Sequence, residues 1–204
     1  GMDRRIGSDF LKTSVGFGGS CFKKDILNLV YICKSYGLDE VADYWHQVYH
    51  INNYQKNRFA RQIIDLKKKR NISSVAILGW AFKKNTNDSR ESASINVTKI
   101  LLNDNLKVFI YDPMVSRNNI INDLKNINSE TNIENEIIDS NVFIENSLLD
   151  AIEKVDVAAI LTEWDEFTKF DWKNYLDNTD KNLNIFDGRN IIDIEHKNIF
   201  KLGK

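Results

Sequence analysis

The sequence predicts an α/β protein in which a helical segment with one long connecting helix precedes a domain built on a mostly parallel β-sheet. Two observations predict this class. A helical repeat of apolar residues runs without proline or glycine from about residue 40 to residue 70. From residue 73 onward, short apolar strands alternate with helical patterns, as they do when crossovers connect parallel strands. We therefore divide the chain into a helical segment, 1–72, and an α/β domain, 73–204.

The helical segment contains two expected helices. The first begins at the N-cap signal Ser20 and stops at Gly37, with apolar residues recurring at helical spacing between them. The second runs from about Glu40 to Arg70 and would span about 45 Å. A helix longer than a small domain is wide usually connects two domains or packs against a copy of itself, and the pattern leaves both possibilities open. The basic run at 67–70 is expected to be its solvated end.

The α/β domain is expected to begin with a strand at 73–79, followed by a helix at 91–104 and a second strand at 106–113. The Asn-rich stretch 118–146 is predicted to be a long loop with at most a short helix and a short strand at 142–144. The remaining elements are expected to be a helix at 147–155, a strand at 156–164, a helix at 167–178 and a last strand at 183–190.

The overall charge excludes some partners. The 28 Lys and Arg residues against 29 Asp and Glu residues leave a formal net charge of −1, so no global positive field draws the protein to nucleic acid or an anionic membrane. No apolar run approaches the roughly 20 residues of a membrane helix, and no signal peptide is recognisable. We therefore expect a cytoplasmic protein whose two cysteines are reduced thiols.

Ligands of open parallel sheets bind outside the carboxyl ends of the strands. The residues expected there are 79–83, 112–113, 162–164 and 187–190, which include cations, aromatic rings and small residues. This set suits a nucleotide phosphate and base. The usual dinucleotide fingerprint G-x-G-x-x-G and the Walker loop are both missing from these positions.

The stretch "SVGFGGSCFKKD" places Cys21 behind a glycine turn and at the start of the first helix. Backbone N–H groups at a helix start and the ammonium groups of Lys23 and Lys24 favour a thiolate, which could attack an aldehyde and hold the product as a thioester. Asp25, one turn on, could orient a water molecule. A structural alternative stays open, in which Cys21 is a small residue filling a helix start. Cys33 is expected to be a packing residue.

His46 and His50 have the i, i+4 spacing of a metal-binding pair on a helix. Because the sequence offers no third ligand at a suitable interval, we interpret them as packing residues and expect no metal site.

Five motifs resemble the UDP-glucose/GDP-mannose dehydrogenase family over essentially the whole chain. They are "FLKTSVGFGGSCFKKD" at 10–25, "GWAFKKNTNDSRESASI" at 79–95, "YDP" at 111–113, "TEW" at 162–164 and "FDGRN" at 186–190. The resemblance implies a Rossmann-like sheet and the NAD-dependent oxidation of UDP-glucose to UDP-glucuronate, in which a cysteine forms first a thiohemiacetal and then a thioester.

The resemblance also implies roles for individual residues. Cys21 matches the nucleophile and Asp25 the carboxylate that organises the hydrolytic water, while Cys21, Lys24 and Arg90 lie on the NAD side. Arg5 matches an arginine that reaches the partner subunit's substrate site, and the long helix matches the family's dimer core, which implies a homodimer or a higher homo-oligomer. The substrate-binding residues implied are Arg5, Phe10, Leu11, Lys12, Val15, Gly16, Phe17, Gly18, Phe82, Lys83 and Arg189.

Family members carry an N-terminal NAD-binding domain, and this chain contains no match to it. We therefore expect a C-terminal part of the enzyme that folds, dimerises, binds UDP weakly and does not turn over substrate alone. Two alternatives stay open: a stand-alone nucleotide-binding and oligomerisation module, and a dehydrogenase for GDP-mannose or a UDP-amino sugar.

Overall fold

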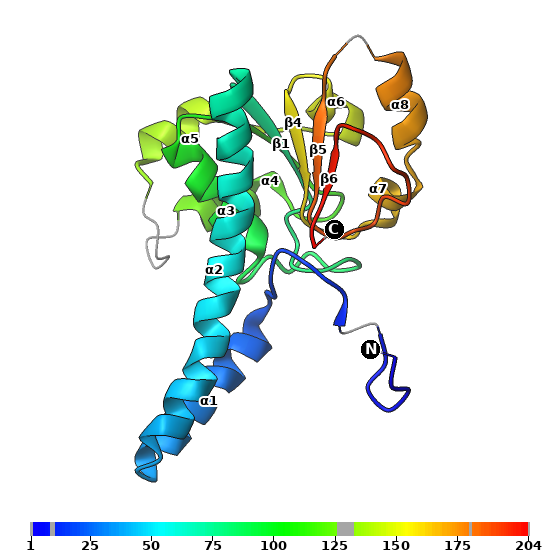
Figure 1. Cartoon of the computed structure of the whole chain (residues 1–204). Coiled ribbons are helices and arrows are strands. Elements are labelled where there is room, and N and C mark those ends of the chain that lie inside the picture. The colour runs from blue at the N-terminus through cyan, green and yellow to red at the C-terminus, as the bar shows by residue number, and fades with distance from the viewer. Residues whose placement is uncertain (1, 9–10, 126–132, 180, 204) are drawn as a thin grey trace.

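The computed structural model describes residues 2–8, 11–125, 133–179 and 181–203. Helices α1 (Ser20–Ser35) and α2 (Asp39–Arg70) form an antiparallel hairpin, and both predicted helices are confirmed. The predicted N-cap was wrong: Ser20 is the first residue of α1, and Gly19 is the N-cap, with no side-chain hydrogen bond. Figure 1 shows the α1 end of this hairpin extending away from the sheet, while the C-terminal half of α2 lies alongside α3 (Ala93–Asn103). The long helix therefore joins the helical segment to the sheet domain.

The two halves of α2 are buried in different ways. Phe59, Ala60 and Ile63 belong to the main hydrophobic core, because this half of the helix covers the sheet domain. The hairpin end has a small separate core of Val30, Cys33 and Ala42. The expected packing role of Cys33 is thus confirmed.

The sheet has six parallel strands in the order β3-β2-β1-β4-β5-β6, which is the Rossmann-like order. The strand order reverses between β1 and β4, so the ligand edge predicted from the sequence lies at their carboxyl ends. The strands are β1 (Ser74–Leu78), β2 (Lys107–Tyr111), β3 (Val142–Ile144), β4 (Val157–Ile160), β5 (Asn184–Asp187) and β6 (Ile199–Lys201).

Helices cover the sheet on both sides: α2, α3 and α5 gather on one side in Figure 1 and α6, α7 and α8 on the other. Their starts are capped where the sequence offers a short polar side chain, as at Ser147, whose hydroxyl accepts a hydrogen bond from the Asp150 N–H (3.1 Å). The shorter helices are α4 (Arg117–Lys125), α5 (Asn135–Asn141), α6 (Leu148–Ile152), α7 (Asp165–Lys169) and α8 (Trp172–Asn178).

Three predictions about elements were wrong. The stretch 118–146 holds two helices, α4 and α5, because Ile120, Leu124 and Ile138 bury an apolar side of each in the core. The helix predicted at 167–178 is two helices, since the Asp171 carboxylate accepts from the Asn174 N–H and starts α8 anew. The strand at 183–190 is not the last, because β6 pairs with β5 at the sheet edge and its Phe200 ring stacks on Phe186.

Candidate functional site

The glycine turn that precedes Cys21 lies on the carboxyl edge of the sheet. Val15 is 1% exposed and packs against Phe59 of α2 and Gly188, the residue after β5. A Cβ atom at Gly188 would collide with the Val15 side chain and approach the Ile160 carbonyl oxygen to 2.8 Å. Glycine at 188 therefore lets the turn settle directly onto the sheet edge.

The same turn packs against the loop that follows β1. The Gly19 N–H donates to the Arg90 carbonyl (2.8 Å), and Gly19 has φ +83°, a left-handed conformation that favours glycine. A Cβ atom at Gly18 would stand 2.7 Å from the Glu91 carbonyl oxygen, and one at Gly19 would stand 3.0 Å from the Phe82 ring. Glycine is thus required at both positions, because the turn and the loop approach each other too closely for a side chain.

A side chain of α2 fastens the middle of the turn. Asn52 Oδ1 accepts a hydrogen bond from the Phe17 N–H (2.8 Å), and Asn52 Nδ2 donates to the Phe17 carbonyl (3.1 Å). The Phe17 ring then meets the Phe22 ring of α1 edge to face, with 4.5 Å between centroids. Gly16 lies beside the same asparagine, since a Cβ atom there would stand 2.6 Å from Asn52 Oδ1.

Cys21 lies in the first turn of α1 and its side chain is exposed. Its Sγ atom is 3.9 Å from the Ser20 hydroxyl. Lys24 and Asp25 are also exposed and follow at i+3 and i+4, the positions that neighbour Cys21 on a helix surface. The structure therefore brings the predicted nucleophile and its two predicted helix neighbours to one solvent-facing surface.

Arg90 lies on the other side of that surface. Its guanidinium pairs with the Asp88 carboxylate in two contacts, of 2.9 Å and 2.7 Å. This pairing raises the pKa of Arg90, and the charge of Cys21 adds a smaller effect in the same direction. Arg90 is therefore near enough to Cys21 for a charge on the thiol to act on its guanidinium.

The other cations at the carboxyl edge are Lys83 and Arg189. The Lys83 ammonium is 5.5 Å from the centre of the Phe82 ring, and its side chain is exposed. Arg189 follows β5 and forms an ion pair with Glu163, which follows β4. The predicted substrate residues Val15, Gly16, Phe17, Gly18, Phe82, Lys83 and Arg189 all lie along this edge or on the turn packed against it.

The remaining predicted site residues belong to the part of the chain that leads into the turn. Arg5 forms an exposed ion pair with its near neighbour Asp3 (2.7 Å). Leu11 and Lys12 are exposed. Phe10 lies outside the described residues.

Two carboxylates at the carboxyl edge of the sheet already accept hydrogen bonds from N–H groups of this chain. Asp187 accepts from the N–H groups of Arg189 (3.2 Å) and Ile192 (2.9 Å) and shapes the loop after β5. Asp112, after β2, accepts five N–H donors. They are the backbone N–H groups of Trp80, Ala81, Met114 and Val115 and the indole N–H of Trp164. The acid that binds a ribose in dinucleotide-binding Rossmann folds is therefore not available here.

Asn52 and Glu91 were missed by the sequence analysis. Asn52 could have been found, because it recurs with Phe59 and Ile63 on the buried side of α2 and is 7% exposed. A polar residue in such a row usually has a hydrogen-bonding partner. Glu91 has no comparable signal in the sequence.

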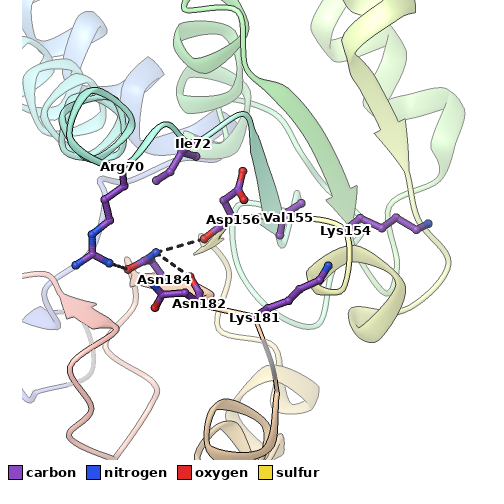
Figure 2. A pocket seen from close by; sticks show the side chains of 8 residues that line it. All are labelled: Arg70, Ile72, Lys154, Val155, Asp156, Lys181, Asn182 and Asn184. Carbon is purple, nitrogen blue, oxygen red and sulfur yellow. Dashed lines mark hydrogen bonds between the residues drawn. The ribbon is translucent and has the colours of Figure 1, made fainter.

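A hollow of about 270 Å³ lies at the opposite, amino end of the strands (Figure 2). Its polar groups hydrogen-bond to one another. Arg70 donates to Asn184 Oδ1 (2.8 Å), and the Asp156 carboxylate accepts from the hydroxyl groups of Ser74 (3.0 Å) and Ser73. It is lined by Arg70, Ile72, Lys154, Val155, Asp156, Lys181, Asn182 and Asn184. Its location and its internal bonds do not suit it as the site of Cys21 chemistry.

The rings of His46 and His50 are in contact on α2, with centroids 4.5 Å apart and a tilt of 58° between their planes. Within the described ranges, no group of three or more His, Cys, Asp or Glu residues could hold a metal ion. In the same ranges, no helix is both long and apolar enough to cross a membrane.

A Rossmann-like parallel sheet with an exposed cysteine loop packed on its carboxyl edge places this chain in the class of Rossmann-like α/β proteins. The profile of the UDP binding domain of the UDP-glucose/GDP-mannose dehydrogenase family matches residues 76–194, and the profile of that family's central domain matches residues 1–54. The chain therefore belongs to the UDP-glucose/GDP-mannose dehydrogenase family.

Named relatives agree with this assignment. The chain is 46% identical over 201 residues to UDP-glucose 6-dehydrogenase 4 of Arabidopsis thaliana, covering 95% of this chain and 42% of the relative. It is 46% identical over 204 residues to UDP-glucose 6-dehydrogenase of Drosophila melanogaster, covering 100% of this chain and 42% of the relative. The chain thus spans less than half the length of these curated relatives.

Solved structures show the same fold. A UDP-glucose dehydrogenase from the archaeon Pyrobaculum islandicum superposes with a TM-score of 0.68 at 28% identity, covering 94% of this chain and 38% of that one. A GDP-mannose dehydrogenase from Pseudomonas aeruginosa superposes with a TM-score of 0.72 at 16% identity, covering 98% and 43%. The second likeness concerns the fold alone.

Proposed function

We propose that this chain forms the nucleophile-bearing and nucleotide-sugar-binding part of an NAD-dependent UDP-glucose 6-dehydrogenase. The observation that supports this most directly is the docking of the Cys21 turn on the sheet edge, where Gly18 and Gly19 meet Phe82 and Glu91. An exposed thiol beside a cationic nucleotide edge suits a reaction in which a sugar nucleotide is oxidised through a covalent intermediate. The 46% identity to two UDP-glucose 6-dehydrogenases favours that substrate over GDP-mannose or a UDP-amino sugar.

Cys21 acts as the nucleophile in this proposal. Its thiolate forms a bond to the carbonyl carbon of the sugar aldehyde, and the carbonyl oxygen takes up a proton, giving a thiohemiacetal. Loss of a hydride to the cofactor and of the hydroxyl proton to solvent then leaves the sugar carbon as a thioester on Cys21. Water then adds to the thioester carbon, and the sulfur leaves as thiolate with the carboxylate released. Asp25, one helical turn beyond Cys21, accepts a hydrogen bond from that water and orients it.

The fit to NAD is partial. The β2 carboxylate Asp112 is fully used within the protein, so this sheet does not hold a dinucleotide in the usual Rossmann manner. The exposed cations Lys24 and Arg90 beside Cys21 suit the pyrophosphate of a cofactor bound mainly by another part of a longer protein. NAD, when bound, supplies the hydride acceptor for the two oxidation stages.

The substrate's diphosphate is placed between the turn and the edge in this proposal. Lys83 and Arg189 provide the positive charge, the backbone of 15–18 allows close approach, and the Phe82 ring offers a stacking surface. Leu11 and Lys12, in the chain that leads into the turn, are proposed to contact the substrate beside these residues.

The α1–α2 hairpin is proposed to form the interface of a homodimer. In that dimer, Arg5 of each subunit reaches the substrate site of the other subunit. Large apolar and aromatic side chains are exposed along it, more than a monomer's surface ordinarily shows in one region. Those exposed by half or more are Tyr31, Tyr36, Tyr44, Ile51 and Tyr54. Both cysteines are free thiols, which supports the proposed cytoplasmic location.

Calorimetric titration of this chain with UDP, UDP-glucose, GDP-mannose and a UDP-amino sugar tests the nucleotide assignment. We expect weak binding of UDP and UDP-glucose, with roughly tenfold loss in Arg189→Gln, because a diphosphate then loses a charged donor. Lys181→Gln, at the opposite end of the sheet, is the matched control and should leave binding unchanged. Tighter binding of GDP-mannose or of the UDP-amino sugar than of UDP-glucose would contradict the assignment of UDP-glucose as the substrate.

An absorbance assay for NADH tests whether the dehydrogenase activity belongs to a longer protein than this chain. The chain alone should produce none from UDP-glucose and NAD, because it covers 42% of the length of its enzyme relatives. NADH formation by the chain alone would contradict the view that the activity belongs to a longer protein.

A further inference from the structure

Lys23 and Lys24 are adjacent in the sequence but make different contacts. The Lys23 ammonium lies 3.0 Å from each carboxylate oxygen of Glu91, which is 68 positions away in the loop after β1. The same ammonium is 5.1 Å from the centre of the Tyr49 ring on α2. Lys23 therefore connects the first turn of α1 to both of the elements that flank it.

Glu91 holds the turn with its backbone as well. Its φ of +57° is a left-handed conformation that a residue with a long side chain seldom adopts, so the surrounding structure must maintain it. Its carbonyl oxygen is the atom nearest to the space beside Gly18, and the neighbouring Arg90 carbonyl accepts the Gly19 N–H (2.8 Å). One short loop thus contacts the turn before Cys21 and the helix after it.

Helix geometry separates the two lysines with respect to the thiol. Residues at i and i+2 do not face each other, so Lys23 points away from Cys21 and toward the loop. Residues at i and i+3 are neighbours, which puts Lys24 on the Cys21 side. The charge of Lys23 is also balanced by Glu91, whereas Lys24 is exposed.

We propose that Lys23 is a positioning residue, which through its ion pair with Glu91 fixes the Cys21-bearing turn of α1 on the loop after β1. The proposal rests on the proposed function in one respect, the role of Cys21 as nucleophile. It differs from the sequence expectation that both lysines act on the thiol in the same way.

Two measurements on the full 204-residue chain separate positioning from charge. Amide hydrogen exchange of the peptide 16–24 reports how firmly the turn is held. Alkylation of Cys21 by iodoacetamide across pH 6 to 10, followed by mass spectrometry, reports the thiolate. Buried Cys33 is the internal control, because its alkylation reports global opening. Neither measurement requires substrate or NAD.

We expect Lys23→Met and Glu91→Gln each to raise exchange in the peptide 16–24 by about fivefold, with little further change in the double variant, because each removes the same pair. Lys23→Arg, which keeps the pair, should stay within about twofold of the parent chain. The pH of half-maximal Cys21 alkylation should be unchanged in Lys23→Met and higher in Lys24→Met. Cys33 should stay protected in all variants.

Unchanged exchange in both Lys23→Met and Glu91→Gln would overturn the positioning role. A rise in the alkylation midpoint of Lys23→Met equal to that of Lys24→Met would show that Lys23 acts by its charge, which also overturns it. Slow alkylation of Cys21 at every pH, with the exchange results as expected, would instead remove the proposed function and leave the ion pair's hold on the turn established.

Discussion

Asn52 closes a two-way hydrogen-bonded contact with the backbone of Phe17: the Asn52 side chain accepts from the N–H at 2.8 Å and donates to the carbonyl at 3.1 Å. A side-chain amide thus takes the place that a neighbouring strand would take in a sheet. Because Asn52 belongs to the long helix α2, the position of the thiol loop depends on where that helix lies. The relationship leads to the first prediction.

Replacing Asn52 by Ala should lower the free energy of unfolding by about 2 kcal/mol, because two backbone groups of Phe17 lose their partners beside a largely buried side chain. Urea denaturation followed by circular dichroism measures the change. Asn28→Ala, at an exposed position of α1, is the control and should change stability by less than about 0.5 kcal/mol. Equal effects of the two substitutions would show that Asn52 does not fasten the turn.

Gly19→Ala should destabilise the chain by about 2–3 kcal/mol, because the new Cβ atom adds a contact with the Phe82 ring to the strain of a left-handed backbone. Gly37→Ala isolates the strain, since Gly37 has φ +70° and nothing within 4 Å of its added Cβ. That control should cost about 1 kcal/mol. If both variants lose the same stability in thermal or urea unfolding, the Phe82 contact has no energetic role.

Asp112→Asn should destabilise the domain by about 2 kcal/mol or more, because an amide group would present its own N–H to donors that now share a carboxylate. Denaturant titration of the purified variant measures the loss. Asp165→Asn is the matched comparison: it breaks only the exposed ion pair with Lys84 and should cost less than about 1 kcal/mol. A cost for Asp112→Asn as small as this would contradict the organising role of its carboxylate.

Ionisation of the Tyr111 hydroxyl should make the free energy of unfolding depend on pH in the alkaline range. Burial, together with the hydrogen bond that its hydroxyl donates to Glu166 (3.0 Å), raises the pKa of Tyr111 from 10.0 to about 12. Since the folded pKa lies above the unfolded one, the contribution is complete below pH 10 and is lost as pH rises toward about 12.

The measurement is urea unfolding at pH 9, 10 and 11 for the parent chain and Tyr111→Phe. The parent should lose stability more steeply than the variant between pH 10 and 11, because the variant has no hydroxyl to ionise. Parallel pH curves for the two proteins would show that Tyr111 does not contribute to the alkaline loss.

Much of the fold follows from local pattern. The helical repeat placed α2 to within one residue of its start, and the apolar runs placed β1, β2, β4 and β5. The division of 167–178 into two helices was not predicted, because Asp171 reads equally well as a helix residue and as the N-cap of a new one. β6 was not predicted either, since three residues at a sheet edge have no periodicity to read.

The sequence by itself determined which segments become helix or strand and that a cysteine follows a glycine turn at a helix start, because propensity and hydrophobic spacing act over a few neighbouring residues. Only the tertiary structure decided what holds that turn. Phe17 meets Asn52 across 35 positions and Lys23 meets Glu91 across 68. Which residues become such partners depends on how α2 and β1 pack in the folded chain. A long-range contact of this kind produces no pattern in the local spacing of either residue.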